Sequence, residues 1–293
     1  MTITAEQTET NLPDVTARTS YPARVMSSGY TDAERRRASD APFDLRPASG
    51  SKLSDLDLNH IERRYLPQAV AADVREQNQR TLEEQMHSLR LLREGVPTWG
   101  ALLAFARDPQ LWLPGAYVQF VRHDGTEITD PIKSHHMLSG QLEDILSSLS
   151  QLLEINIETS VDVISGPREQ RYPDYPIEAL RQLSYNAIMH RNYDGTNAPC
   201  RLRWFSDRVE IESPGGLFGT ITPESLKQGA TDYRNQLVAE LMANLGFAQR
   251  FGLGIPLAQR SLRENGNPDI SFMVEQSRIQ VTVGSAKRSG VKR

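Results

Sequence analysis

The sequence has a single cysteine, Cys200, no long apolar run and no glycine-rich loop of the P-loop type. One cysteine cannot form an intramolecular disulfide and cannot supply a cysteine-based zinc site. No segment approaches the roughly 18 apolar residues that a membrane-spanning helix needs. The first residues have neither the basic nor the apolar region of a signal peptide. We therefore expect a cytoplasmic protein without a membrane partner.

Neither sign of charge dominates the chain. Its 293 residues include 33 Lys and Arg and 37 Asp and Glu, which gives a net charge of −4. This balance excludes a globally basic nucleic-acid-binding protein. At roughly 100–200 residues per domain, the length predicts one large domain or two small ones, with a core that needs no disulfide or metal to fold.

Polar residues are concentrated at the two ends of the chain. Residues 1–51 have few large apolar side chains, so they bury too little surface to offset the entropy of ordering them. We expect a flexible arm at 1–51 and a basic tail at 284–293. Two interpretations of their cations stay open: a solvated surface, which we favour, and a weak contact with DNA phosphates. The cations are Arg35, Arg36, Arg37, Lys287, Arg288, Lys292 and Arg293.

Helical and strand patterns alternate between the two ends. The spacing of apolar residues predicts helices at 81–93, 138–153, 173–190, 234–245 and 254–265. Thr81 and Glu84 form a capping box at the start of the helix predicted at 81–93. Apolar runs and turn residues predict strands at 101–106, 117–122, 200–205, 208–212, 270–274 and 278–283. This order favours an α/β (α+β) fold in which helices cover an open, mixed or antiparallel sheet.

The helix predicted at 173–190 has an unusual polar face. Gln182, Asn186 and His190 are spaced i, i+4 and i+8, so their side chains stack along one side of the helix. A buried amide is costly when it has no partner. Two interpretations are open: a solvated face, or amide and imidazole groups that point into a ligand cleft.

Two glycine-rich loops follow this helix. Ser213-Pro214-Gly215-Gly216 comes after a predicted strand, and Gly252-Leu253-Gly254 directly precedes a predicted helix. Glycine lets backbone N–H groups at a helix N-terminus approach an anion, which the helix dipole also favours. Each loop alone is more often a simple turn, but the order of polar-faced helix, first loop and second loop is uncommon by chance.

These motifs together resemble a known family. The helix end N-A-x-x-H-R-x-Y begins at Asn186, the strand end D-R-x-E-I-x-S-P-G-G-L spans 207–217, and Arg234-Asn235 is followed by the G-x-G-I of 252–255. This set is similar to that of divergent GHKL-type ATP-binding proteins, known as RecG-like or Schlafen AlbA-type transcriptional regulators. The resemblance covers about 55–283.

The resemblance implies a Bergerat-like fold with a nucleotide site for ATP and Mg²⁺. Asn186 would be the Mg²⁺ ligand, the loop from Ser213 to Gly216 would lie near the adenine, and Gly252 and Gly254 would lie against the phosphates. Gln182, His190, Arg234 and Asn235 complete the set of candidate binding residues. The implied organisation is an arm at 1–51 left from an AlbA-type domain, a helical and α/β middle region at 52–165, an ATP-binding domain at 166–283 and a tail.

One departure from the family bears on catalysis. GHKL ATPases have a glutamate four residues before the asparagine that activates the attacking water, and here this position is Gln182. An amide does not accept a proton at neutral pH, so it cannot act as a general base. A second departure is Ser213, which stands where the usual loop has an adenine-contacting aspartate.

Three functions remain as alternatives. We favour an ATP-binding regulatory protein with weak or no hydrolysis, in transcriptional regulation or a related bacterial control or defence system, acting as a dimer or with a partner protein. In an active ATPase, Glu178 would replace the base, but it lies eight residues before Asn186, about 12 Å along a helix. The third function is a degenerate ATPase fold that acts as an interaction scaffold without nucleotide.

Overall fold

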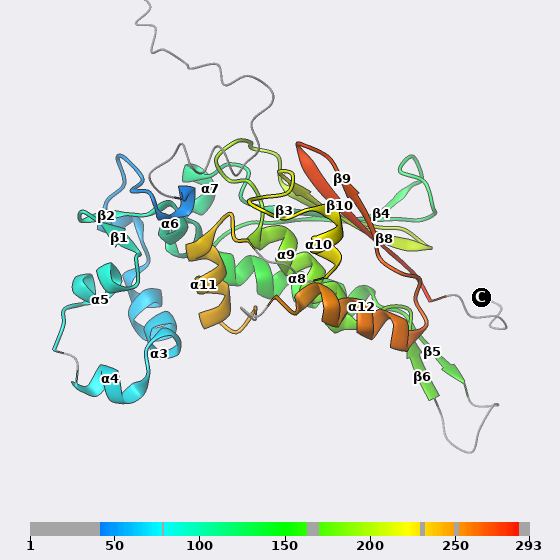
Figure 1. The fold of residues 1–293 in the computed structure, drawn as a ribbon, viewed down its shortest axis with the longest axis horizontal. Coiled ribbons are helices and arrows are strands. Elements are labelled where there is room, and N and C mark those ends of the chain that lie inside the picture. The colour runs from blue at the N-terminus through cyan, green and yellow to red at the C-terminus, as the bar shows by residue number, and fades with distance from the viewer. Residues whose placement is uncertain (1–41, 78, 163–169, 229–231, 249–251, 287–293) are drawn as a thin grey trace, which may run out of the picture. The chain divides into compact units, whose positions relative to one another are not determined.

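A six-stranded mixed sheet forms the centre of the protein (Figure 1). The computed structural model describes residues 42–77, 79–162, 170–228, 232–248 and 252–286. The strand order is β4-β3-β7-β8-β10-β9, and every neighbouring pair is antiparallel except β3 and β7. The strands are β3 (Val118–His123), β4 (Ile132–Leu138), β7 (Cys200–Trp204), β8 (Arg208–Pro214), β9 (Ser271–Val274) and β10 (Arg278–Gly284).

The two faces of the sheet differ because strand residues alternate in direction. In β7, Cys200, Leu202 and Trp204 are buried toward the helices, while Arg201 and Arg203 lie on the other face. The arginines meet the carboxylate of Glu212 from β8, at 2.7 Å from Arg201 and 3.0 Å from Arg203. Burial alone would raise the pKa of Glu212, but the guanidinium groups outweigh it and hold this pKa below its usual range. The outer face is thus charged and internally paired.

Helices cover the apolar face. α9 (Ile177–Met189) packs against β7 and β8 and contacts both α8 (Leu142–Asn156) and α12 (Gly254–Asn265) (Figure 1). α11 (Gln236–Asn244) also contacts α9, and α10 (Pro223–Lys227) contacts α12. α9 is therefore the helix on which the rest of the layer is assembled. None of the helices in the described ranges is long and apolar enough to span a membrane.

The first part of the described chain consists of short elements around α6. They are η1 (Phe43–Leu45), η2 (Leu53–Asp55), α2 (Leu58–His60), η3 (Ile61–Tyr65), α3 (Leu66–Ala69), α4 (Ala72–Gln77), α5 (Leu82–Ser88), β1 (Leu92–Arg93), β2 (Val96–Pro97), α6 (Trp99–Phe105) and α7 (Pro109–Trp112). A separate hairpin of β5 (Thr159–Asp162) and β6 (Gln170–Pro173) precedes α9. The capping box predicted at the start of α5 is confirmed, with Glu84 N–H donating to Thr81 Oγ1 at 3.3 Å and Thr81 N–H to Glu84 Oε2 at 2.7 Å.

The structure differs from the predictions in three places. The helix predicted at 81–93 ends at Ser88, and Leu92–Arg93 form the strand β1. Residues 101–106 were expected as a strand but belong to α6, whose N-cap is Thr98, with its hydroxyl oxygen accepting the N–H of Ala101 at 3.3 Å. The run is buried on all sides, so it has no amphipathic period from which a helix could be recognised. β4 was not expected at all, because its residues alternate between apolar and polar only weakly and are mostly exposed.

Asp44 connects the start of the described chain to the helical layer. Its carboxylate accepts the N–H of Val238 at 3.0 Å and so caps the first turn of α11, although it is only 2 % exposed. Burial raises the pKa of Asp44 to about 6. Residues 43–51 therefore pack on the folded body.

The predicted middle region and the predicted ATP-binding domain share one sheet. β3 and β4 come from the middle region at 52–165, and β7 to β10 come from the range 166–283.

Candidate functional site

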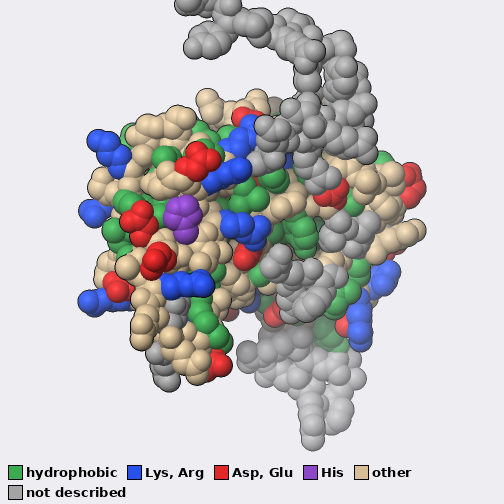
Figure 2. Space-filling view, turned by 60° about the vertical axis from the view of Figure 1, so that its left-hand side comes forward, with side chains coloured by type: hydrophobic (Ala, Val, Ile, Leu, Met, Phe, Trp, Pro, Cys, Tyr) green, Lys and Arg blue, Asp and Glu red, His purple; other side chains and the backbone are tan. Residues whose placement is uncertain are grey.

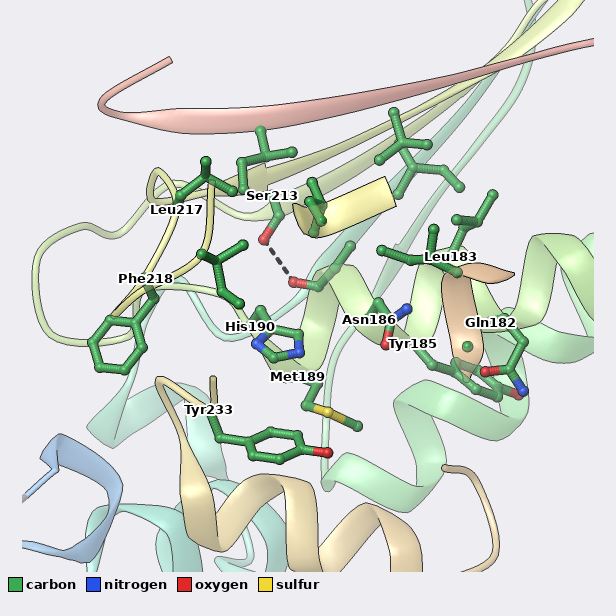
Figure 3. A pocket seen from close by; sticks show the side chains of 18 of the residues that line it. Gln182, Leu183, Tyr185, Asn186, Met189, His190, Ser213, Leu217, Phe218 and Tyr233 are labelled. Carbon is green, nitrogen blue, oxygen red and sulfur yellow. Dashed lines mark hydrogen bonds between the residues drawn. The ribbon is translucent and has the colours of Figure 1, made fainter. Parts of the chain in front are cut away.

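The polar face of α9 opens into a cavity between the helices and the sheet. Gln182, Asn186 and His190 all line it, and Figure 3 shows them in a row along the helix. The cavity has about 1140 Å³ of free space, counting its open mouth. It is also lined by the glycine-rich loops predicted to form the site, at Ser213, Gly215, Gly216, Gly252 and Gly254. The structure thus brings together segments that lie far apart in the sequence.

One end of the cavity is formed by the N-terminus of α12. A Cβ atom at Gly254, the first residue of this helix, would lie 3.0 Å from Gln182 Oε1 and 3.2 Å from Asn186 Nδ2. The glycine therefore lets the helix end approach both amides. Among the residues that the structure describes, no side chain caps α12, so the N–H groups of its first turn can face an anion, apart from Pro256, which has none.

His190 and Tyr233 form the other end. Their rings stack with centroids 5.7 Å apart and an interplanar angle of 12°. Burial lowers the pKa of His190 to about 4, and the positive charge of Arg234 acts in the same direction. The imidazole is consequently neutral at pH 7 and offers one donor and one acceptor nitrogen. Asp232 also lines the cavity and is the one carboxylate among its described lining residues.

The last carbonyl groups of α9 would have no partner within the helix, and other segments supply donors for them. The carbonyl oxygen of Ala187 accepts the Ser213 hydroxyl at 2.6 Å (Figure 3) and the Cys200 thiol at 3.4 Å. That of Ile188 accepts the hydroxyl of Tyr193 at 2.9 Å. Burial raises the pKa of Cys200 to about 11, so this cysteine remains a thiol at neutral pH. Ser213 thus lines the cavity and also holds the helix end.

Arg234 and Asn235 complete this cap. The Asn235 amide donates to the carbonyl oxygens of Met189 at 2.8 Å and of Arg191 at 2.7 Å, and the residue is 1 % exposed. Arg234 donates to the carbonyl oxygens of His190 at 3.2 Å and Gly216 at 2.7 Å. Neither is among the residues that line the cavity. They were predicted as binding residues, and the structure places them behind the cavity wall, against the backbone.

The glycines at 215 and 216 allow two loops to meet. Gly215 has a φ of +103°, and a Cβ at Gly216 would lie 2.7 Å from the carbonyl oxygen of Glu275. The N–H of Gly215 donates to Ser277 O at 2.7 Å and that of Gly216 to Gln276 O at 3.1 Å. These two amides are therefore used by the turn between β9 and β10, and a ligand would contact the loop through other atoms.

Sequence reasoning missed most of the apolar lining and both Asp232 and Tyr233. The apolar side chains come from α9, from the sheet and from the segments on either side of α10 and α11, among them Leu183, Ile211, Leu217, Phe218, Phe247 and Phe272. No local motif identifies them, although Asp232 and Tyr233 directly precede the Arg234-Asn235 pair. Most of the cavity wall is thus apolar, with polar groups confined to a few positions, as in many small-molecule sites.

Metal binding at this site would depend on Asn186. Within the described ranges, no group of three or more His, Cys, Asp and Glu side chains could hold a metal ion. An amide oxygen suits Mg²⁺, which commonly takes one or two protein ligands and obtains the rest from phosphates and water. The amide of Asn186 at an open helix N-terminus fits that arrangement. The cations predicted as DNA contacts, at 35–37, 287, 288, 292 and 293, lie outside the described residues.

Comparison with known proteins agrees with the sequence motifs. The family model described as "Putative ATP-dependent DNA helicase recG C-terminal" matches residues 197–283, which include both glycine-rich loops and begin after His190. No curated protein matches the chain. The DIP2311 protein from Corynebacterium diphtheriae has a similar solved structure, with a TM-score of 0.63 at 20% identity over 86% of this chain and 49% of that chain.

The structural likeness shows that the two proteins share a fold, and this chain spans about half the length of the Corynebacterium protein. The family match adds the class of domain that the fold carries. Both agree with the mixed sheet covered by helices that the sequence predicts. Over residues 197–283, the chain is therefore similar to the RecG-like, ATPase-type family.

Proposed function

We propose that the cavity binds ATP or a related nucleotide with Mg²⁺, and that the protein acts as a nucleotide-dependent regulator with little or no hydrolysis. One observation carries the proposal: Gln182, Asn186 and His190 line one cavity between a stacked aromatic end and an open helix N-terminus. Gln182 and His190 are eight residues apart, which is about 12 Å along the helix at 1.5 Å per residue. An elongated ligand with an aromatic end and an anionic end suits this arrangement.

Each end of the cavity suits one part of a nucleotide. The neutral His190 and Tyr233 offer flat surfaces and hydrogen-bonding atoms to a base. The N-terminus of α12, with the amides of Gln182 and Asn186 beside Gly254, suits phosphates. Mg²⁺, when bound, would neutralise phosphate charge, with Asn186 as its protein ligand.

The predicted lack of hydrolysis rests on Gln182. A carboxylate at this place could take a proton from water, whereas an amide cannot. Asp232 is the one carboxylate among the described lining residues, and it precedes Tyr233 at the aromatic end of the cavity. Binding without efficient turnover would make the nucleotide a signal for the protein's shape or assembly, as a dimer or with a partner protein in transcriptional or defence control.

Calorimetric titration of the whole chain with ATP tests this proposal, in the presence and absence of Mg²⁺. We expect binding that Mg²⁺ strengthens, and Asn186→Ala should remove the Mg²⁺ dependence. Asn244→Ala is the matched control, because the amide of Asn244 bonds to the Tyr65 hydroxyl and does not line the cavity. No heat and no thermal shift at millimolar nucleotide would refute nucleotide binding and favour the scaffold function.

A second variant tests the assignment of Gln182. Gln182→Glu places a carboxylate beside the same helix end, and we expect phosphate release to rise above the level of the unmodified protein. Release that is already rapid in the unmodified protein would contradict the regulatory proposal, and release that persists in Asn186→Ala would place the activity at another site.

A further inference from the structure

A second cavity is lined by the residues that follow α9. It has about 510 Å³ of free space, counting its mouth, and among described residues it shares no lining side chain with the first cavity. Its walls come from η1, α6, α7 and the segment after α9. Figure 1 shows α6 and α7 close together, and both η1 and α6 contact α11. The nucleotide-binding proposal makes no use of this cavity.

Aromatic side chains from three elements, η1, α6 and α7, line this cavity. Phe43 and Trp99 stack with centroids 5.2 Å apart and an interplanar angle of 19°, and Trp112 also lines the cavity. The chain has three tryptophans, and the third, Trp204, is 2 % exposed and packs on Tyr175 under the sheet. Half-buried indole rings around an open space offer flat surfaces on which another ring can stack.

Arg191 gives the cavity a positive charge. This arginine is 2 % exposed and donates to the carbonyl oxygens of Asn192, Thr196 and Ala198, at 2.7–3.3 Å. Its guanidinium also lies 4.6 Å from the centre of the Tyr193 ring. Within the described part of the chain, no carboxylate forms an ion pair with it. Carbonyl groups satisfy its hydrogen bonds but bring no negative charge, so the described residues leave the charge of the buried guanidinium without an ionic partner.

We propose that this cavity binds a flat aromatic ring that carries an anionic group, as a nucleotide does, either free or within a single strand. The ring stacks on Trp99 and Trp112, and the anion is drawn by the field of Arg191. Asp194 lies at the rim, where its half-exposed carboxylate is 3.6 Å from Arg46. The negative charge of this acid repels an anion, so it weakens the binding of the ligand.

Fluorescence titration of the whole chain tests this proposal, since two of its three tryptophans line the cavity. The probes are thymidine, which has the ring without the charge, thymidine monophosphate, and a single-stranded oligodeoxythymidine. We expect the monophosphate to quench the tryptophans and to bind about tenfold more tightly than thymidine, with an affinity that falls as salt rises. A higher affinity of the oligomer per site than of the monophosphate assigns the ligand to a strand, and an equal or lower affinity assigns it to the free nucleotide.

Two variants and a control make the test specific. Trp112→Ala should remove the binding, whereas Leu111→Ala should not, because Leu111 is the neighbouring residue, is 79 % exposed and does not line the cavity. Asp194→Asn should tighten monophosphate binding about threefold, since it removes an opposing charge. If Trp112→Ala fails to fold, Asp194→Asn alone decides. Equal affinities for thymidine and its monophosphate, or no effect of Asp194→Asn, would overturn the proposal.

Discussion

Replacing Asn235 with alanine separates a structural role from a ligand-binding role. The side chain donates to two carbonyl groups at the end of α9, at 2.8 Å and 2.7 Å, and is almost fully buried. Alanine removes both hydrogen bonds and leaves the carbonyl groups of Met189 and Arg191 without these donors. If Asn235 instead contacted a nucleotide, the same change would weaken binding and leave the free energy of unfolding nearly unchanged.

The magnitude follows from the two bonds. A hydrogen bond contributes about 1 kcal/mol net, and its loss costs about 1–3 kcal/mol when the remaining carbonyl group is buried without a partner. With two such carbonyl groups, we expect Asn235→Ala to lower the free energy of unfolding by about 2–6 kcal/mol, out of the roughly 5–15 kcal/mol of a typical protein. Asn235→Asp should be worse, because a carboxylate cannot donate to the carbonyl groups and would be buried as a charge.

Urea unfolding measures this difference through the midpoint of the transition at constant slope. Asn244→Ala, on the same helix, is the matched control, because it loses one half-buried hydrogen bond to Tyr65 and should cost about 1 kcal/mol. A loss below 1 kcal/mol for Asn235→Ala, or an aspartate variant as stable as the alanine variant, would refute the capping role that we assign to Asn235.

Three further predictions concern other parts of the molecule. The folded-state pKa of Asp44, about 6, lies above its ordinary value of 3.8, so between these pH values the folded protein binds more protons than the unfolded chain, and its stability falls as pH rises from about 4 to 6. In calorimetric melting, the melting temperature of Asp44→Asn should therefore depend less on pH than that of the unmodified protein. An equal pH dependence of the two proteins would contradict the burial of this acid. Gly254→Ala should leave the melting temperature unchanged or raise it, because alanine favours the helix. The same change should reduce nucleotide affinity roughly tenfold, because the added methyl group crowds Gln182 and Asn186. An unchanged affinity in titration would contradict the assignment of the phosphate end of the site. Since His190 titrates near pH 4, nucleotide affinity should not change through protonation of this imidazole between pH 5.5 and 8, and an inflection near pH 6.5 that disappears in His190→Ala would contradict its neutral state.

The sequence was sufficient to predict the parts of the site that depend on local pattern. The i, i+4, i+8 spacing on α9 placed Gln182, Asn186 and His190 on one face, and the glycine at the start of α12 marked the helix N-terminus that meets them. Both follow from helix geometry, which acts over a few residues. The strands predicted at 200–205 and 208–212 are also present, as the antiparallel pair β7 and β8, because apolar runs bounded by turn residues are a local pattern too.

Features that depend on distant partners were not predictable. No local sequence motif indicates that Asn235 caps a helix end 46 residues away. Likewise, no motif indicates that Asp44 caps a helix 194 residues away. The apolar run of α6 was misassigned as a strand because a segment that is buried on every side shows neither the helical nor the strand period of apolar residues. In each case the deciding information is which surface the segment meets, and this is fixed by the tertiary structure.

Charged side chains of both signs are distributed over the surface. Figure 2 shows one face of the molecule, where basic and acidic side chains are interspersed and neither sign covers a broad area. Such a surface provides little long-range attraction for a polyanion. On this face, recognition would depend on shape and short-range contacts, as in the two cavities.

The parallel pairing of β3 with β7 makes the two halves of the chain dependent on each other for folding. Val118 pairs with Cys200, so the central sheet closes only after a segment of about 80 residues, including α8 and α9, has been placed on its face. Contacts between residues so distant in sequence slow folding, because loop closure precedes the stabilising interactions. A fragment covering only 197–283 would expose an edge of β7 and the apolar face that α9 covers, so expression of that fragment alone should give aggregated protein, whereas co-expression with the preceding residues should restore a soluble complex.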